Sequence, residues 1–566
     1  MRFPWRSPLF LSLLLITSLL AGCPHAASAP STTPANTGTG GNSTSGSYVN
    51  GNQATGVNPS SYSLSDSLGV LSLYPDNGNF TVSLSGAQTA VAAVTSVNKS
   101  GTLSLSLNWG GNNSAAAYRI QGLQESGQDR TERLLRLYAR HLKATPIPRT
   151  TQAVAPISVG DARTFNILDF STTTPTVATF SAHAVYVYNA PTGQNGSFVI
   201  WVDDRDASIF QGASSPLNTI ATTLQDHIYP TDTQVFGSDT TIAENNAEPA
   251  DKRIDITDDY IHFVFTHMVD NGTATTMGDG TLGFFTLTDF TTDPASNHDK
   301  ILYLASSATS GALNDMLATV AHEFQHLLFS CHRVQTIGLQ NHLNEFNSDA
   351  IAWLNEGMSM EAMLLNGYGP DGANPSPSII NHIAAYLSMP DQYSMTNFFA
   401  TNGNPTDAYG MVTLFMQYLD ARFGDGILRE FHTYDDSATM YDDPSNPNSV
   451  DPTDLAEHVL AAHGTSLSQI FPDFAVSLAL DGANIPMTAS QSALYQLGRV
   501  DLRKTYVTPD GNVALQGPRA LPPGTNLVLP PFSIGYESES SLSSPLALQF
   551  SNATGTGFEA RLIAVK

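Results

Sequence analysis

Alternation of apolar and polar positions is the clearest pattern in the first part of the chain. Between residues 62 and 107, short runs such as 80–84 and 103–107 place an apolar side chain at every second position, and Gly and Asn separate the runs. A period of two is typical of half-buried β-strands. A charged helical stretch at 130–143 and a proline-rich linker follow, so we expect an N-terminal β-rich module over residues 61–150.

The pattern changes twice further along the chain. Apolar strand candidates at 184–188, 198–202 and 261–265 mix with one helix candidate at 218–229. Helical spacing dominates from 311 to 480, and strands return from about residue 526. Strands first and helices second indicate an α+β central domain over residues 151–485, followed by a C-terminal β module over residues 486–566.

The first residues have the pattern of an export signal. Arg2 and Arg6 precede an apolar run from residue 9 to residue 20, which leads into Ala21-Gly22-Cys23. The run is short for a membrane-spanning helix, and small residues before a cysteine are what lipoprotein signal peptidase accepts. We expect a signal peptide over residues 1–22 and a lipid on Cys23, with an ordinary secretory signal and an incidental cysteine as the alternative.

Residues 23–60 contain Ser, Thr, Gly, Asn and Pro with scarcely an apolar side chain, which predicts a flexible tether. Pro24 is not the Asp that retains lipoproteins at the inner membrane, so we expect an outer-membrane anchor or a released extracellular form. Cys331 is the second of only two cysteines, so the mature chain cannot form an internal structural disulfide.

Acidic side chains outnumber basic ones 50 to 24, which gives a formal net charge of −26 spread along the chain. Nucleic acid is therefore excluded as an expected partner, because phosphate binding needs clustered Lys and Arg. The acidic clusters at 203–206, 255–259 and 442–443 offer oxygen ligands that could bind structural Ca²⁺, but none has the spacing of an EF-hand loop. Solvated loops are the simpler interpretation of these clusters.

One segment carries a metal-binding motif. Residues 311–329 have apolar side chains at three- and four-residue spacing, which predicts a helix with one buried face. Within it, His322 and His326 lie four residues apart and project from the same side, so both imidazoles can bind one zinc ion. Glu323 is then placed beside the open coordination position, as a general base for a water molecule that zinc has made acidic.

Two residues compete as the third ligand. His332 has the offset of the third histidine in metzincins, but Phe329 stands where metzincins have the Gly that lets the chain leave the helix. Glu356 lies thirty residues after His326, on a second predicted helix that Ser348 or Asp349 can cap and that residues 366–367 can end. A carboxylate from that helix completes a His₂Glu site with a position left for water.

The segments 319–327 and 353–359, Thr-Val-Ala-His-Glu-Phe-Gln-His-Leu and Trp-Leu-Asn-Glu-Gly-Met-Ser, resemble the hyicolysin-type family of secreted bacterial metallopeptidases. The similarity extends from about residue 198 to residue 480 and includes 251–256, 282–285 and 409–419. It implies a zincin-like fold of the gluzincin kind, with a mixed sheet, an edge strand before the metal helix and a mainly helical lower half. It also implies hydrolysis of proteins or peptides with one Zn²⁺.

The resemblance carries over one more catalytic residue and leaves one position open. Related gluzincins use a Tyr to stabilise the oxyanion, and Tyr409 falls in the matching helical segment, although it also begins an apolar stripe. Thermolysin-like enzymes have an acidic residue four positions after the ligand Glu, where this chain has Met360. Glu361 and Asp349 are the candidates to orient the histidines instead.

These patterns predict a zinc endopeptidase anchored to the bacterial envelope, acting on protein or peptide substrates. The main alternative is a surface adhesin or binding lipoprotein in which the β modules bind a partner and the zincin domain is a scaffold. Exopeptidase action is less favoured, because the chain lacks a Gly-x-Met-Glu-Asn segment of the kind with which aminopeptidases hold a substrate N-terminus.

Overall fold

The computed structural model describes residues 61–73, 80–109, 127–150, 155–169, 176–191, 195–269, 281–310, 312–399, 406–508, 511–540, 542, 546–554 and 558–566. The expected signal peptide, Cys23 and the tether lie outside these residues. Within the described part of the chain, no helix combines the length and hydropathy that a bilayer-crossing segment requires.

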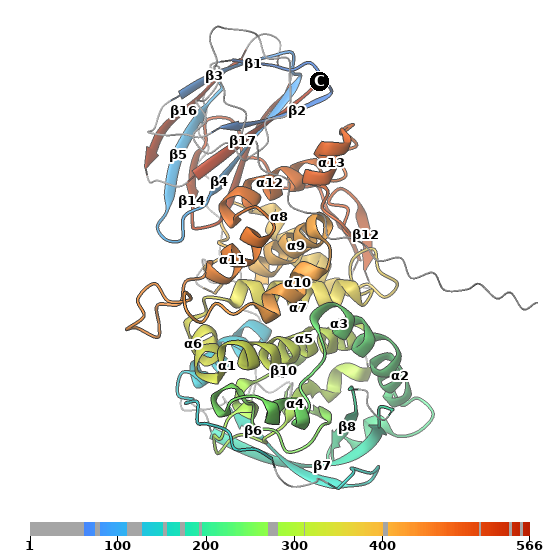
Figure 1. Ribbon diagram of the computed structural model, residues 1–566. Coiled ribbons are helices and arrows are strands. Elements are labelled where there is room, and N and C mark those ends of the chain that lie inside the picture. Colours follow the sequence, from blue (N-terminus) through green and yellow to red (C-terminus); the bar gives the residue numbers. More distant parts are fainter. Residues whose placement is uncertain are drawn as a thin grey trace, which may run out of the picture. The chain divides into compact units, whose positions relative to one another are not determined.

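The central domain contains a six-stranded mixed sheet in the order β10-β11-β9-β8-β7-β6 (Figure 1). Strands β8, β9 and β11 are parallel and completely buried, as their continuous apolar sequences require. At one edge, β10 runs antiparallel to β11, with Phe285 opposite Leu302. The strands are β6 (Ala162–Asp169), β7 (Thr176–Tyr188), β8 (Phe198–Asp203), β9 (Ile261–Thr266), β10 (Gly283–Phe285) and β11 (Lys300–Ala305).

Helix α5 (Leu313–Ile337) follows β11 after a 3-10 turn and packs against both β10 and β11. Helix α7 (Ala352–Leu365) packs on α5, and α9 (Thr406–Phe423) packs on α7, so α5 lies between the sheet and these two helices (Figure 1). The chain is therefore an α+β protein. The helix expected at 218–229 is α2 (Leu217–Thr223), a π turn (Leu224–Ile228) and α3 (Tyr229–Phe236) in succession.

The second motif helix begins later than its expected caps. Asp349, with φ of 59°, is the C-terminal cap of α6 (Leu339–Ser348), and α7 is preceded by Ile351. Asn366 ends α7 and Gly367 adopts a positive φ of 80°, as the sequence predicted. The other helices are α1 (Gly127–Ala139), α4 (Ile242–Ala247), α8 (Pro377–Ser388), α10 (Gly426–Thr433), α11 (Asp454–Ala462), α12 (Leu467–Leu480) and α13 (Ala489–Tyr495).

The two flanking β regions form one β-sandwich rather than two modules. Its sheets have the orders β1-β3-β16-β5-β14 and β15-β4-β17-β2, and one apolar core lies between them. The strands are β1 (Ser61–Ser63), β2 (Leu68–Leu73), β3 (Phe80–Ser85), β4 (Thr89–Ser96), β5 (Leu103–Asn108), β14 (Asn526–Leu529), β15 (Ile534–Ser540), β16 (Leu546–Thr554) and β17 (Phe558–Val565). The C-terminal strands complete sheets whose N-terminal strands would otherwise have exposed edges.

Helix α1 also departs from the expected domain boundaries, because the sequence predicts it within the N-terminal β-rich module. Its Leu135 and Ala139 are buried in the same core cluster as the six-stranded sheet, and it packs against α6 and β10. An amphipathic helix needs an apolar surface to cover. The central domain supplies that surface, so it takes in residues from 127 onward. A hairpin of β12 (Thr505–Thr508) and β13 (Gly511–Ala514) stands apart from the other sheets.

Candidate metal centre

His322 and His326 lie one turn apart on α5, so their rings project from the same side of the helix. Their Nε2 atoms are 3.2 Å apart. Because α7 packs on α5, Oε2 of Glu356 lies 3.3 Å from Nε2 of His322 and 3.5 Å from Nε2 of His326. The structure thus brings together the three side chains that the sequence singled out as metal ligands.

These separations match those of a tetrahedral zinc site. With zinc–ligand bonds of about 2.0–2.1 Å, neighbouring ligand atoms of a tetrahedron lie about 3.3 Å apart. Glu356 is fully buried, and its Oε2 accepts no hydrogen bond from the described residues. A buried carboxylate oxygen without a donor is costly unless a cation balances it. Two imidazoles and one carboxylate therefore fit a zinc ion with a fourth position open.

The pKa shifts of His322 and Glu356 favour the forms of these two side chains that bind a metal. Burial lowers the pKa of His322, which keeps its imidazole neutral. Burial alone would raise the pKa of Glu356, but the adjacent His326 and His322 side chains hold that pKa well below its usual value. Neutral imidazoles and an ionised carboxylate are the forms that coordinate a divalent cation.

Glu323 connects the cluster to the sheet edge. It follows His322 directly on α5 and is fully buried. Its Oε2 accepts a 2.9 Å hydrogen bond from the backbone N–H of Phe285 in β10. One carboxylate oxygen of Glu323 is thereby held against the edge strand β10, on the helix that carries both histidines.

Tyr409 lies beside His322. Their ring centroids are 6.3 Å apart, and Tyr409 also packs against Phe398 at 5.0 Å and His382 at 5.4 Å. Tyr409 is 5% exposed, so it belongs to the apolar stripe of α9 as well as to the surroundings of the cluster. His382, from α8, is a neighbour of the site that the sequence did not indicate.

The side chain that contacts the ring of His326 from α7 is Ser359, whereas Glu361 and Asp349 were the expected candidates to orient the histidines. Its Oγ lies 2.9 Å from Nδ1 and 3.3 Å from Nε2 of His326, and it donates to Oε1 of Gln325 at 2.5 Å. Glu361 instead pairs with Arg499 at 2.5 Å. Ser359 stands three residues after Glu356, on the same face of α7. This three-residue offset from Glu356 is the signal in the sequence that points to Ser359.

His332 is directed away from the cluster. Its Nε2 lies 2.8 Å from the carbonyl oxygen of Ser238, and its Nδ1 lies 3.2 Å from Nδ1 of His432. Helix α5 continues unbroken past Phe329 to Ile337, so a residue six positions after His326 projects from another side. Glu356, rather than His332, is the side chain that joins the histidine pair.

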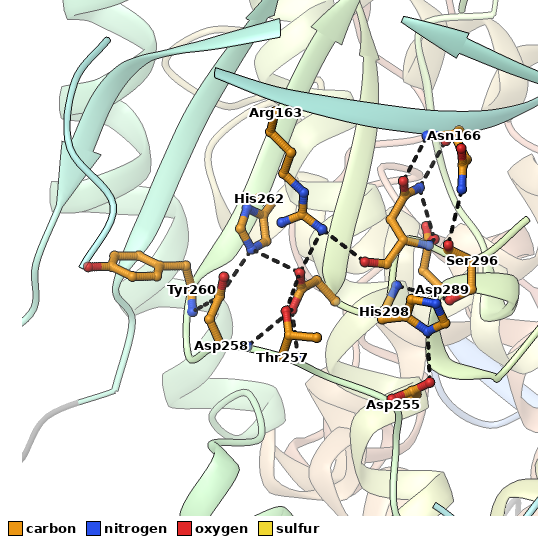
Figure 2. Close-up of polar contacts among 12 residues, drawn as sticks. Arg163, Asn166, Asp255, Thr257, Asp258, Tyr260, His262, Asp289, Ser296 and His298 are labelled. Carbon is orange, nitrogen blue, oxygen red and sulfur yellow. Dashed lines mark hydrogen bonds and ion pairs between the residues drawn. The ribbon is translucent and has the colours of Figure 1, made fainter. Parts of the chain in front are cut away.

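Among the residues that the structure describes, two other groups of Asp and His are close enough to share an ion, but they have protein partners. In the group of Asp258, His262 and Asp299, the last accepts hydrogen bonds from Thr257 and an ion pair from Arg163 at 2.8 Å. Figure 2 shows Arg163 and His262 directed toward one shared carboxylate, and the ion pairs of both are with Asp299. His262 itself accepts from Trp201 and lies 3.1 Å from Asp258.

The second group, Asp203 with Asp206 and His267, is engaged in the same way. Arg205 donates to both carboxylate oxygens of Asp203, at 2.9 and 2.7 Å, and Ser306 donates to Asp206 at 2.7 Å. Asp443, from the third acidic cluster, accepts from Ser445. At least one carboxylate in each of the three acidic clusters thus accepts hydrogen bonds from the protein itself.

Arg136 of α1 is a site residue that no sequence pattern indicated. Its Nη2 lies 3.0 Å from Oε1 of Glu356, the carboxylate oxygen opposite the histidines. Its guanidinium lies between the rings of Phe346 and Phe399, 4.7 and 4.5 Å from their centroids. Arg136 therefore holds one oxygen of Glu356 while the other faces the imidazoles.

No protein-family model matches the chain, and no curated protein shows significant similarity to it.

Proposed function

We propose that this chain is a zinc-dependent endopeptidase of the gluzincin type. The observation that carries the proposal is the convergence of Nε2 of His322, Nε2 of His326 and Oε2 of Glu356 at separations of 3.2 to 3.5 Å. Three ligands from two packed helices leave a fourth position for water, which is the arrangement of catalytic rather than structural zinc.

The fold we assign to the central domain is zincin-like, and the family it resembles is the hyicolysin type. Support comes from the antiparallel edge strand β10, the long helix α5 behind it and the helices packed on α5. An edge strand next to the metal helix is a position at which an extended peptide can add to a sheet. This favours cleavage within a chain over removal of terminal residues.

Bound zinc would supply Lewis acidity, lowering the pKa of a water molecule and polarising a peptide carbonyl. Glu323 would act as the general base that takes a proton from the attacking water, and as the general acid that gives it to the amide nitrogen when the C–N bond breaks. Tyr409 is the donor that we assign to the developing oxyanion. Attachment through a lipid on Cys23 would hold the enzyme at the envelope.

The metal is the first thing to measure. We expect the purified protein to bind about one zinc ion, the Glu356→Ala variant to lose it, and the His332→Ala variant to retain it. Zinc content by mass spectrometry decides between these ligands. A protein that binds no zinc and cleaves no peptide would contradict the proposal and favour a binding lipoprotein. This applies both to the wild type and to variants in which the packing of helix α1 has been weakened by substitution.

A further inference from the structure

At the candidate metal centre, helix α1 links the segment before β10 to helix α7. Near its start, Oγ1 of Thr131 lies 2.8 Å from Oγ1 of Thr281, just before the edge strand β10. Five residues later, Arg136 reaches Glu356 on α7. Leu135 and Ala139 anchor the helix in the core of the central domain. The helix thus contacts β10, which packs on α5, and Glu356 of α7.

The cluster is closed off in this arrangement. His322 and His326 are 8% and 5% exposed, and Glu323 and Glu356 are 0% exposed. A cleft of about 1000 Å³ adjoins α1, and its lining includes Arg136, Leu137, Arg140, Phe398 and Phe399 but none of the three candidate ligands. Arg136 is the residue that both lines this cleft and contacts Glu356. The Arg136 side chain therefore lies between the cleft and Glu356.

The contacts of Arg136 are those of a side chain that can be released. A guanidinium has five N–H donors. Arg136 is 3% exposed, its Nε has no hydrogen-bond partner among the described residues, and its Nη1 is 3.8 Å from Asp349. Oδ1 of Asp349 also has no hydrogen-bond partner there. A buried polar group with incomplete hydrogen bonding is costly, which lowers the net stabilisation that the Arg136–Glu356 contact gives to α1.

We propose that helix α1 is an internal inhibitory segment, held by Arg136 over the metal centre, and that it must move before a peptide can reach Glu323. The inference rests on the proposed peptidase function, since it concerns access to the same site. The segment that occupies this surface is α1 itself, and the surface that α1 covers runs from β10 to α7. Displacement would join the cleft to the cluster and leave the Glu356 ligand in place.

The test loosens α1 in two independent ways. Arg136→Ala removes the contact with Glu356, and Leu135→Ala weakens the apolar anchor without touching the cluster. For each zinc-loaded variant, the rate at which a chelator extracts zinc and the turnover of a quenched fluorescent peptide are measured. We expect both rates to rise about tenfold or more, because a buried charge-assisted hydrogen bond or anchor is lost.

Lys143→Ala is the control, because Lys143 is an exposed basic residue shortly after the helix that does not line the cleft. It should leave both rates unchanged. Unchanged rates in Arg136→Ala and Leu135→Ala would overturn the proposal. So would loss of zinc from Arg136→Ala with no gain of turnover in Leu135→Ala, since Arg136 would then only position Glu356. Absence of zinc from the wild-type protein would instead count against the peptidase function.

Discussion

The backbone N–H of Phe285 in β10 donates a 2.9 Å hydrogen bond to Oε2 of Glu323 on α5. This bond orients the candidate general base from the edge of the sheet. A glutamine at position 323 can still accept it through its amide oxygen, but an amide cannot take up a proton from water. The geometry and the proton transfer can therefore be separated by one substitution.

We expect Glu323→Gln to keep zinc and the fold while lowering peptide turnover by about 10²–10⁴-fold, the range for loss of a general base. Turnover is measured with a fluorescent peptide in a background where α1 has been loosened by Leu135→Ala. Zinc content and the melting temperature are the controls. Full turnover in the glutamine variant would show that Glu323 is not the base.

Ser359 gives a prediction about metal affinity. Its hydroxyl contacts the ring of His326 and is itself held by Gln325. Groups that contact a metal ligand from behind typically change metal affinity or activity by about 10–100-fold. Ser359→Ala should therefore weaken zinc binding by about tenfold, measured by competition with a chelator. Met360→Ala, one residue further along α7, should leave the zinc affinity within about twofold of wild type because its apolar side chain supplies no hydrogen bond to His326.

Tyr409 gives a prediction about the transition state. Its ring lies beside His322, and the proposed role uses only its hydroxyl. Tyr409→Phe should lower kcat by about 10–10³-fold while zinc affinity and KM change little, as expected when one oxyanion donor is lost. Tyr418→Phe is the control on the same helix, since the Tyr418 hydroxyl donates to the carbonyl of Leu494 instead. Equal effects of the two substitutions would mark Tyr409 as a packing residue.

The sequence predicted those parts of the molecule that depend on local spacing. The four-residue interval between His322 and His326 fixes their common direction on a helix, and the apolar stripe around Glu356 indicated the second helix. Ser359 could have been found by the same reasoning. Its offset of three residues from Glu356 is a local relation too.

Contacts between distant segments were beyond such reasoning. Arg136 meets Glu356 across 220 positions of the chain, and nothing in its own neighbourhood signals a partner. The pairing of β3 with β16 and of β4 with β17 likewise joins the two ends of the chain. Alternation specifies which face of a strand is buried but not which strand lies beside it. The two β modules therefore looked separate in the sequence.

The β-sandwich contains a carboxyl group that should make stability depend on pH. Burial raises the pKa of Glu537 to about 8, although Trp109 and Gly524 donate to its Oε2. In the unfolded chain the pKa returns to about 4.3. Between these values the folded protein keeps a proton that the unfolded chain releases, so stability falls as the pH rises, by at most about 1.4 kcal/mol per pH unit. The decrease ends above about pH 8, where both states are ionised.

Glu537→Gln has no such proton, so its melting temperature should gain on that of the wild type between pH 5 and pH 9 in metal-free buffer. Parallel melting curves for the two proteins across this range would mean that Glu537 is already ionised in the folded sandwich.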